Sequence, residues 1–270
     1  RWLGVGAITI QPSEIAKLGL IIYFAASLSQ AKDKIKSFSY LFRYLILMGL
    51  FMGLLILEPH FSVCIIIGFT LVIMLLVSGA KVQHFVFLSI PVAIAGVAAV
   101  LMEPYRLKRL IAFRDPFQDA LGTGWQIIQS LYAIGSGGLF GVGFGNSRQK
   151  FLYVSEPQND FIFAILCEEL GFIGASIILM LFSALILRGY YIASKAPDKF
   201  GMLLAAGVTT QIAVQTIFNV GVVSGLLPVT GASLPFFSAG GTSLLMLMAE
   251  VGVVLSVSRR RVSDKDKSEG

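Results

Sequence analysis

One aspartate, Asp160, stands where a polar segment at 148–159 meets a long apolar run. A carboxylate at the mouth of a membrane helix loses part of its hydration, so its proton affinity rises toward the range useful for a general base. Asp is also a favoured helix N-cap, because the helix dipole favours negative charge there. The position alone favours capping, and the surrounding charges bear on the choice.

Basic residues outnumber acids in the segment 103–159 that leads to Asp160, and they are Arg106, Lys108, Arg109, Arg114, Arg148 and Lys150. A solvated loop does not need so many cations. Cations beside a membrane-level carboxylate suit an anionic lipid head group. This excess weakens the capping interpretation of Asp160 and favours a site for a charged, membrane-bound ligand.

Polar side chains also interrupt the apolar runs, where they are costly and usually face a protein interior or a water-filled cavity. They are Glu14, Lys17, Glu168, Gln211, Gln215, Asn219 and Glu250. Glu14 and Lys17 are spaced to pair on one helix face. The two glutamines and Asn219 recur every fourth residue as one stripe, which favours hydrogen bonds between helices. Glu168 lies eight residues after Asp160, so we expect the two carboxylates to share a helix face at a separation of roughly 12 Å.

Composition places these residues in a membrane protein. The chain is 56% hydrophobic and 13% charged, with a net charge of +6, and its mean hydropathy is +0.82; soluble domains are about 25% charged. Cys64 and Cys167 lie in apolar runs and are expected to be packing residues. His60 and His84 lie at opposite ends of one run, so they cannot share a metal.

Apolar runs long enough for a bilayer core, which needs roughly 20 residues per helix, predict the architecture. We expect an all-α, polytopic transmembrane helix bundle forming one domain over residues 1–258, with a disordered, charged cytoplasmic tail at 259–270. The seven predicted spans are 13–28, 44–57, 61–78, 85–102, 161–187, 200–223 and 243–257. No signal peptide or charged leader precedes the first span, so the chain is expected to begin partway through a protein.

Short loops rich in Lys and Arg follow the first, third, fifth and seventh spans, and such loops are expected to be cytoplasmic. The long segment 103–159 and Asp160 would then face the outside, where no ATP is available. A reaction at Asp160 would need a substrate that carries its own leaving group.

Two further stretches of the outer side have distinctive patterns. Apolar residues around Trp125 recur at helical spacing, which predicts a helix that lies in the interface or re-enters it. The glycines of 135–145 are not followed by Lys-Ser/Thr, so close backbone packing is favoured over a phosphate loop. The uncharged segment 229–242 is expected to fold back beside the Asp160 helix and to line a groove; the alternative is a plain hydrophobic turn.

Several long motifs resemble the SEDS family of shape, elongation, division and sporulation proteins, which contains FtsW, RodA and SpoVE. They are RWLGVGAITIQPSEIAKL, DPFQDALGTGWQIIQSLYAIGSGGLFGVGFGNSRQKF, EPQNDFIFAILCEELGFIG and FNVGVVSGLLPVTGASLPFFSAGGTSLL. The resemblance spans nearly the whole chain. It implies a ten-helix fold, of which the first three helices would be missing here.

By this resemblance the chain would be a glycosyltransferase that polymerises lipid II into peptidoglycan glycan strands, with Asp160 as the essential acid. Gln158 and Asn159 replace the family's usual His-Thr, and His60-Phe61-Ser62 replaces Asp-Leu-Gly; the first change bears on the orientation of the carboxylate. The candidate substrate-binding residues are Arg109, Arg148, Lys150, Glu156 and Gln129. A divalent cation, Mg²⁺ or Mn²⁺, is an open alternative as cofactor.

The resemblance also implies partners: lipid II itself, a class B penicillin-binding protein transpeptidase and other division or elongation proteins, with no role for nucleic acid. Two other functions stay open. Buried polar residues on several spans would also suit a transporter that flips lipid II, although a transporter has little use for a carboxylate amid outward cations. A membrane scaffold for other wall enzymes is compatible with the enzyme.

Overall fold

The computed structural model describes residues 3–5, 8–58, 61–102, 104–152 and 159–260. Helices occupy all seven predicted spans, and they are α1 (Pro12–Ala31), α2 (Phe38–Leu57), α3 (Phe61–Val77), α4 (Val82–Leu101), α8 (Ile162–Ser194), α9 (Lys199–Val223) and α10 (Gly241–Arg259). Four of them, α2, α8, α9 and α10, are long and apolar enough to cross a membrane, and α3 and most of α4 are shorter apolar helices. The chain is therefore a helical membrane protein.

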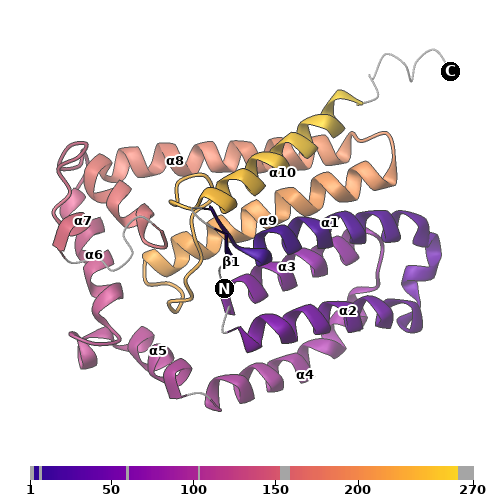
Figure 1. Ribbon diagram of the computed structural model, residues 1–270, viewed down its shortest axis with the longest axis horizontal. Helices are drawn as coiled ribbons and strands as arrows, with labels where there is room; N and C mark the ends of the chain where they lie inside the picture. Colours follow the sequence, from indigo (N-terminus) through magenta and orange to yellow (C-terminus); the bar gives the residue numbers. More distant parts are fainter. Residues whose placement is uncertain (1–2, 6–7, 59–60, 103, 153–158, 261–270) are drawn as a thin grey trace. The chain divides into compact units, whose positions relative to one another are not determined.

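The chain forms two compact units, one from the described residues within 1–84, 183–214 and 240–260 and the other from those within 85–182 and 215–239. The helices α4, α8 and α9 contribute residues to both. In the first unit α3 packs between α1 and α2, and α1 also contacts α10. Figure 1 shows α1, α2 and α3 running alongside one another, so the first predicted spans form a helical layer.

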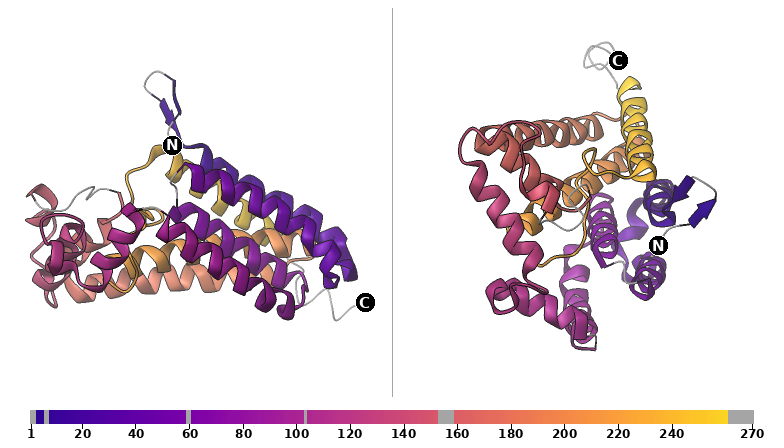
Figure 2. Two further views of the ribbon diagram at one scale, coloured as in Figure 1. Left: turned by 90° about the horizontal axis from the view of Figure 1, so that it is seen from below. Right: turned by 60° about the vertical axis from the view of Figure 1, so that its left-hand side comes forward.

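A short β-hairpin precedes α1 and was not predicted. Its strands β1 (Leu3–Val5) and β2 (Ile8–Ile10) pair antiparallel, with Leu3 opposite Ile10. β-Branched side chains such as Val5, Ile8 and Ile10 favour strands, and the prediction, which considered only apolar runs of membrane length, did not use this local preference. Figure 2 shows the hairpin projecting from the start of that helix.

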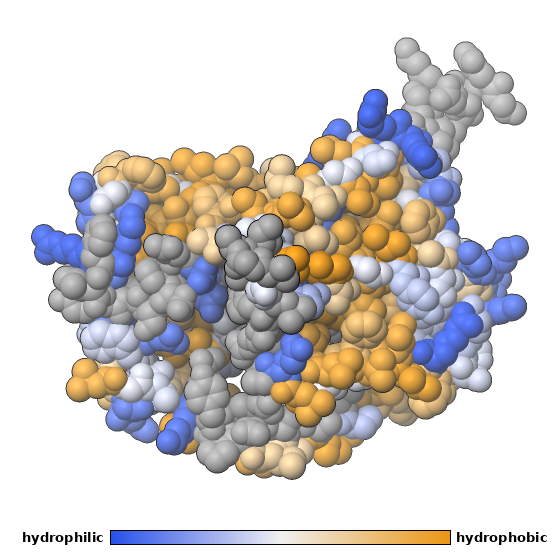
Figure 3. Space-filling view, in the orientation of Figure 1, coloured by the Kyte–Doolittle hydropathy of each residue, from blue (hydrophilic) through white to orange (hydrophobic). Residues whose placement is uncertain are grey.

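The membrane-length helices differ in how much of their surface is covered. Of the most apolar window of α9, 78% is buried, against 11–22% for α2, α8 and α10. Figure 3 shows hydrophobic side chains over the visible part of α10, with hydrophilic ones at its C-terminal end. Exposed leucines on α10 are suited to lipid, whereas α9 carries its polar stripe in the interior.

The segment 103–159 has more regular structure than a loop. It contains α5 (Pro104–Arg114), the 3₁₀-helix η2 (Pro116–Asp119), α6 (Trp125–Gly137) and the short α7 (Gln149–Leu152). The predicted helix around Trp125 is α6, which extends from Trp125 to Gly137. The other three elements were not predicted, because their sequences lack a long apolar period.

In the second unit α8 breaks at Gly171, whose φ of 67° is non-helical. The glycine-rich stretch after α6 fills the break. The amides of Val142 and Gly143 donate to the carbonyls of Glu168 and Glu169 at 3.0 and 3.1 Å, and the Phe172 amide donates to Gly138 at 2.8 Å. The glycines therefore serve close backbone packing, as predicted, whereas the break in the predicted span 161–187 was not foreseen.

A matched pair of glycines on α6 tests this packing. A Cβ at Gly137 would overlap the carbonyl of Cys167, whereas a Cβ at Gly135 meets nothing within 4 Å. We expect Gly137→Ala to lower the melting temperature in detergent by roughly 2–10 °C, since overpacking costs about 1–3 kcal/mol. Gly135→Ala should leave it unchanged or raise it. Equal melting temperatures for the two variants would contradict the contact.

Candidate functional site

Asp160 lies in a turn immediately before α8 and is half-buried. The carbonyl of the next residue, Phe161, accepts the first helical hydrogen bonds, from the amides of Ala164 and Ile165 at 3.0 and 3.5 Å. Asp160 is therefore one residue outside the N-cap position. The expectation that Asp160 and Glu168 share a face of one helix was wrong, because the helical repeat does not extend back to Asp160.

Asn219 of α9 fixes the backbone at Asp160. Its fully buried side-chain amide donates two hydrogen bonds of 2.7 Å, one to the Asp160 carbonyl and one to the Ala232 carbonyl. The Ser238 hydroxyl donates to the Asn159 carbonyl, also at 2.7 Å. These bonds confirm the prediction that part of the segment 229–242 lies beside Asp160. Its depth in the membrane stays a prediction.

The same segment has further anchors. The Gln215 amide donates to the carbonyl and hydroxyl of Ser233 at 3.0 and 3.2 Å. Phe236 has a positive φ of 67°, and its ring lies 6.4 Å from the ring of Phe182 on α8. A left-handed backbone at a bulky residue is strained, and such strain persists only where the surroundings impose it. The stretch 232–238 is therefore held in place by contacts with α9 and α8.

Glu168 is a second anchor, on the first part of α8. This carboxylate is buried and accepts from the Ser147 hydroxyl at 2.5 Å and from the Arg148 amide at 3.1 Å. The Ser147 oxygen in turn accepts from the Lys150 amide at 3.1 Å, which caps the start of α7. Glu168 therefore fixes the backbone that carries Arg148 and Lys150.

The side chains of those two cations are exposed. The ammonium of Lys150 lies 4.0 Å from the carboxylate of Glu169. Gln129 is buried on α6. Glu156 and the side chain of Arg109 lie outside the described part of the chain, so their predicted roles stay predictions.

One acid of the basic segment is held ionised. Thr123 donates from its backbone amide and its hydroxyl to Asp119, at 2.8 and 2.9 Å. These hydrogen bonds hold the pKa of Asp119 below its usual value. Asp119 therefore offsets part of the positive charge of the segment near neutral pH.

The remaining polar residues of the spans are paired as expected. Lys17 and Glu14 on α1 are both buried, with the ammonium 2.9 Å from the carboxylate. The Gln211 amide donates to both oxygens of Glu250 at 2.8 and 2.9 Å. Gln211 thus bonds to another helix, as predicted, whereas Gln215 and Asn219 bond to the non-helical segment at 232–233 and to the turn at Asp160. Cys64 and Cys167 are free and buried.

Sequence reasoning missed Ser147, Ser233 and Ser238. Ser147 had a local signal, because serine is a favoured N-cap and polar residues follow it. Ser233 and Ser238 had none, since their partners lie 18 and 79 residues away in the chain. Such pairs become visible only once the helices are placed.

Comparison with known proteins fits this arrangement. The family described as cell cycle protein, which comprises FtsW, RodA and SpoVE, matches residues 1–263. The chain belongs to this family.

Its relatives cover almost the whole chain. Stage V sporulation protein E of Bacillus subtilis is 50% identical over 262 residues, which are 96% of this chain and 71% of that protein. A probable peptidoglycan glycosyltransferase FtsW of a Geobacter species is 40% identical over the same shares of both chains.

Solved structures of the family share the fold. A chain of a peptidoglycan synthase complex, whose structure concerns coordination of polymerization and crosslinking, has a TM-score of 0.80 at 32% identity, covering 97% of this chain and 74% of that one. The rod shape determining protein RodA of Thermus thermophilus has a TM-score of 0.64 at 28% identity, covering 97% and 70%.

The role of the two Asn219 hydrogen bonds can be tested by measuring the stability of a variant. Asn219→Ala removes the donors to one buried and one part-buried carbonyl, so we expect the free energy of unfolding to fall by about 1–3 kcal/mol. Hydrogen exchange should also speed up in peptides that cover 229–239. Asn146→Ala is the control, because Asn146 is exposed and its amide makes one long bond of 3.4 Å. If both variants behave like the parent chain, Asn219 does not fix this backbone.

Proposed function

We propose that this chain is a peptidoglycan glycosyltransferase that polymerises lipid II into glycan strands at the outer face of the bacterial cytoplasmic membrane. Its family membership supports this, since relatives are named probable peptidoglycan glycosyltransferases. The observation that carries the proposal is the half-buried Asp160, whose flanking backbone is held by Asn219 and Ser238. A rigid backbone positions a general base for proton transfer.

In the proposed reaction the 4-hydroxyl of the acceptor sugar attacks the anomeric carbon of the donor. A glycosidic C–O bond forms, the bond from that carbon to the polyprenyl pyrophosphate breaks, and the configuration inverts. Asp160 takes the proton of the attacking hydroxyl. The substrate brings its own leaving group, so no nucleotide is needed outside the cell.

Arg109, Arg148 and Lys150 would stabilise the departing pyrophosphate by their charge, with Gln129 and Glu156 contributing to the substrate site. The anchoring of Arg148 and Lys150 at Glu168 supports a defined place for their backbone. A divalent cation, Mg²⁺ or Mn²⁺, stays part of the proposal: it would help to neutralise the pyrophosphate, and Mg²⁺ commonly uses one or two carboxylates together with substrate phosphates. Among the described residues no three acidic, His or Cys side chains cluster, so no ligands are assigned to it.

The proposal includes an orientation. Seven spans, Lys- and Arg-rich cytoplasmic loops and a cytoplasmic C-terminus put Asp160 and the segment 103–159 outside. The basic end of α10, with Arg259 and Arg260, is consistent with the cytoplasmic side.

A crosslinking partner follows from the same proposal. The related chain of the peptidoglycan synthase complex belongs to an assembly that coordinates polymerization and crosslinking. We therefore expect a class B penicillin-binding protein to bind this chain, together with other division or elongation proteins.

Asp160→Ala tests the catalytic role. The loss of a general base typically costs about 10² to 10⁴ in rate, so we expect glycan synthesis from lipid II to fall by that factor. The assay uses the protein purified with its partner, with and without EDTA, and follows chain length on gels. Asp33→Ala is the matched control, because the Asp33 carboxylate is exposed and forms a surface ion pair with Lys36, three residues further along the chain.

A loss of only twofold in Asp160→Ala, with the protein inserted and folded, would overturn the role of Asp160 as base. Reconstituted vesicles separate the enzyme from a transporter. Glycan lengthening supports the enzyme, whereas translocation of lipid II without lengthening supports transport.

A further inference from the structure

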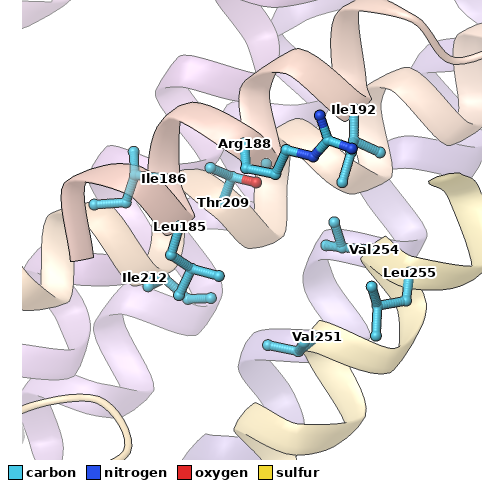
Figure 4. Close-up of a pocket in the computed structure, with 10 residues that line it drawn as sticks. Leu185, Ile186, Arg188, Ile192, Thr209, Ile212, Val251, Val254 and Leu255 are labelled. Atoms are coloured by element: carbon cyan, nitrogen blue, oxygen red, sulfur yellow. The ribbon is translucent and has the colours of Figure 1, made fainter. Parts of the chain in front are cut away.

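A groove in the first unit lies between α8, α9 and α10, away from Asp160 in sequence and unused by the proposed reaction. Its volume is about 90 Å³, and its lining is apolar apart from Arg188 and Thr209. At its floor α8 and α9 touch, since a Cβ at Gly189 would overlap the Thr209 side chain. Figure 4 shows α10 as the opposite wall, with Val251 and Leu255 facing the other two helices.

The groove has a charged end and an apolar end. Figure 4 shows Arg188 extending toward Ile192, which is nearer the end of α8 at Ser194. Leu185, Ile212 and Val251 line the part farther from that end. The two ends differ by about two helical turns, or roughly 10 Å along the axis. A ligand that fits must be charged at one end and apolar along its length.

Arg188 is exposed, and its guanidinium lies 5.2 Å from the ring of Tyr191. None of the described carboxylates lies within 4 Å of it. Arg188 comes directly after the predicted span 161–187, so its guanidinium is expected at the level of the lipid head groups. The planar guanidinium matches a phosphate with two parallel hydrogen bonds. The charge on this groove therefore selects an anion.

The size of the groove selects an acyl chain over a protein segment. A helix with its side chains is about 10 Å or more across, which exceeds what a cavity of about 90 Å³ admits. An extended hydrocarbon chain is much thinner. The apolar side chains that line the groove would pack against such a chain.

We propose that this groove binds one anionic glycerophospholipid, with its phosphate on Arg188 and an acyl chain along Leu185, Ile212 and Val251. Under the proposed orientation the lipid belongs to the cytoplasmic leaflet, which carries negative surface charge. Binding of this lipid can be measured without lipid II, so the test of the groove does not depend on the proposed polymerase reaction.

The experiment is native mass spectrometry of the purified protein titrated with phosphatidylglycerol or phosphatidylcholine. We expect one phosphatidylglycerol to bind preferentially, and Arg188→Gln to weaken it about tenfold through loss of a charge-assisted bond. Arg188→Lys should retain much of the affinity. Leu185→Trp fills the apolar end and should abolish binding, whereas Leu187→Trp, on the same helix but outside the groove, should not.

Equal affinity for the two lipids, or unchanged phosphatidylglycerol binding by Arg188→Gln, would overturn the site. Binding that survives in Leu185→Trp as well as in Leu187→Trp would place the lipid elsewhere. If Leu185→Trp does not fold, the comparison of Arg188→Gln with Arg188→Lys decides. An inactive polymerase that still binds phosphatidylglycerol would contradict the proposed function and leave this site intact.

Discussion

The side-chain amide of Asn219 is the interaction on which the candidate site depends. Backbone that leaves a helix inside an apolar bundle exposes carbonyls that neither water nor lipid satisfies, and each costs several kcal/mol. The Ala232 carbonyl is buried with its bond, the bond to the Asp160 carbonyl is part-buried, and one amide with two N–H donors satisfies both carbonyls. Asn219 also joins the Asp160 turn to the segment 232–238. The same two hydrogen bonds therefore satisfy backbone carbonyls and position the residue that carries the carboxylate.

The break in α8 solves the same problem with backbone alone. At Gly171 the helix gives up its own hydrogen bonds, and the stretch 138–143 supplies replacements to residues 168–173. Glycines are needed because a Cβ at Gly141 would overlap the Glu169 carbonyl. Close approach leaves no room for side chains here, whereas at Asn219 a side chain of the right length replaces the second backbone. The break lies in α8, which directly follows Asp160 in the chain, whereas Asn219 lies on α9, 59 residues from Asp160.

The two kinds of contact explain what could be predicted from sequence. The helices and the Glu14–Lys17 pair follow from local spacing, and the stripe of Gln211, Gln215 and Asn219 follows from a four-residue repeat. The hydrogen-bond acceptors of the stripe cannot be predicted in this way, since nothing near Asn219 in the sequence identifies Ala232 as its acceptor. The break at Gly171 was missed for a similar reason: an apolar run looks continuous until another segment offers hydrogen bonds to interrupt it. The resemblance pointed to Asp160, but its held backbone depends on long-range pairs.

The buried carboxylate of Glu168 adds a last step. A buried polar group is tolerated when hydrogen bonds satisfy it, and here the Ser147 hydroxyl and the Arg148 amide donate to the Glu168 carboxylate. The backbone at 147–150 is therefore fixed, while the side chains of Arg148 and Lys150 reach the surface, where the Lys150 ammonium lies 4.0 Å from the Glu169 carboxylate. Buried hydrogen bonds thus set the place of both cations, and Glu169 offsets part of the charge of Lys150. Under the proposed function, this fixed backbone keeps the two cations close to the departing pyrophosphate.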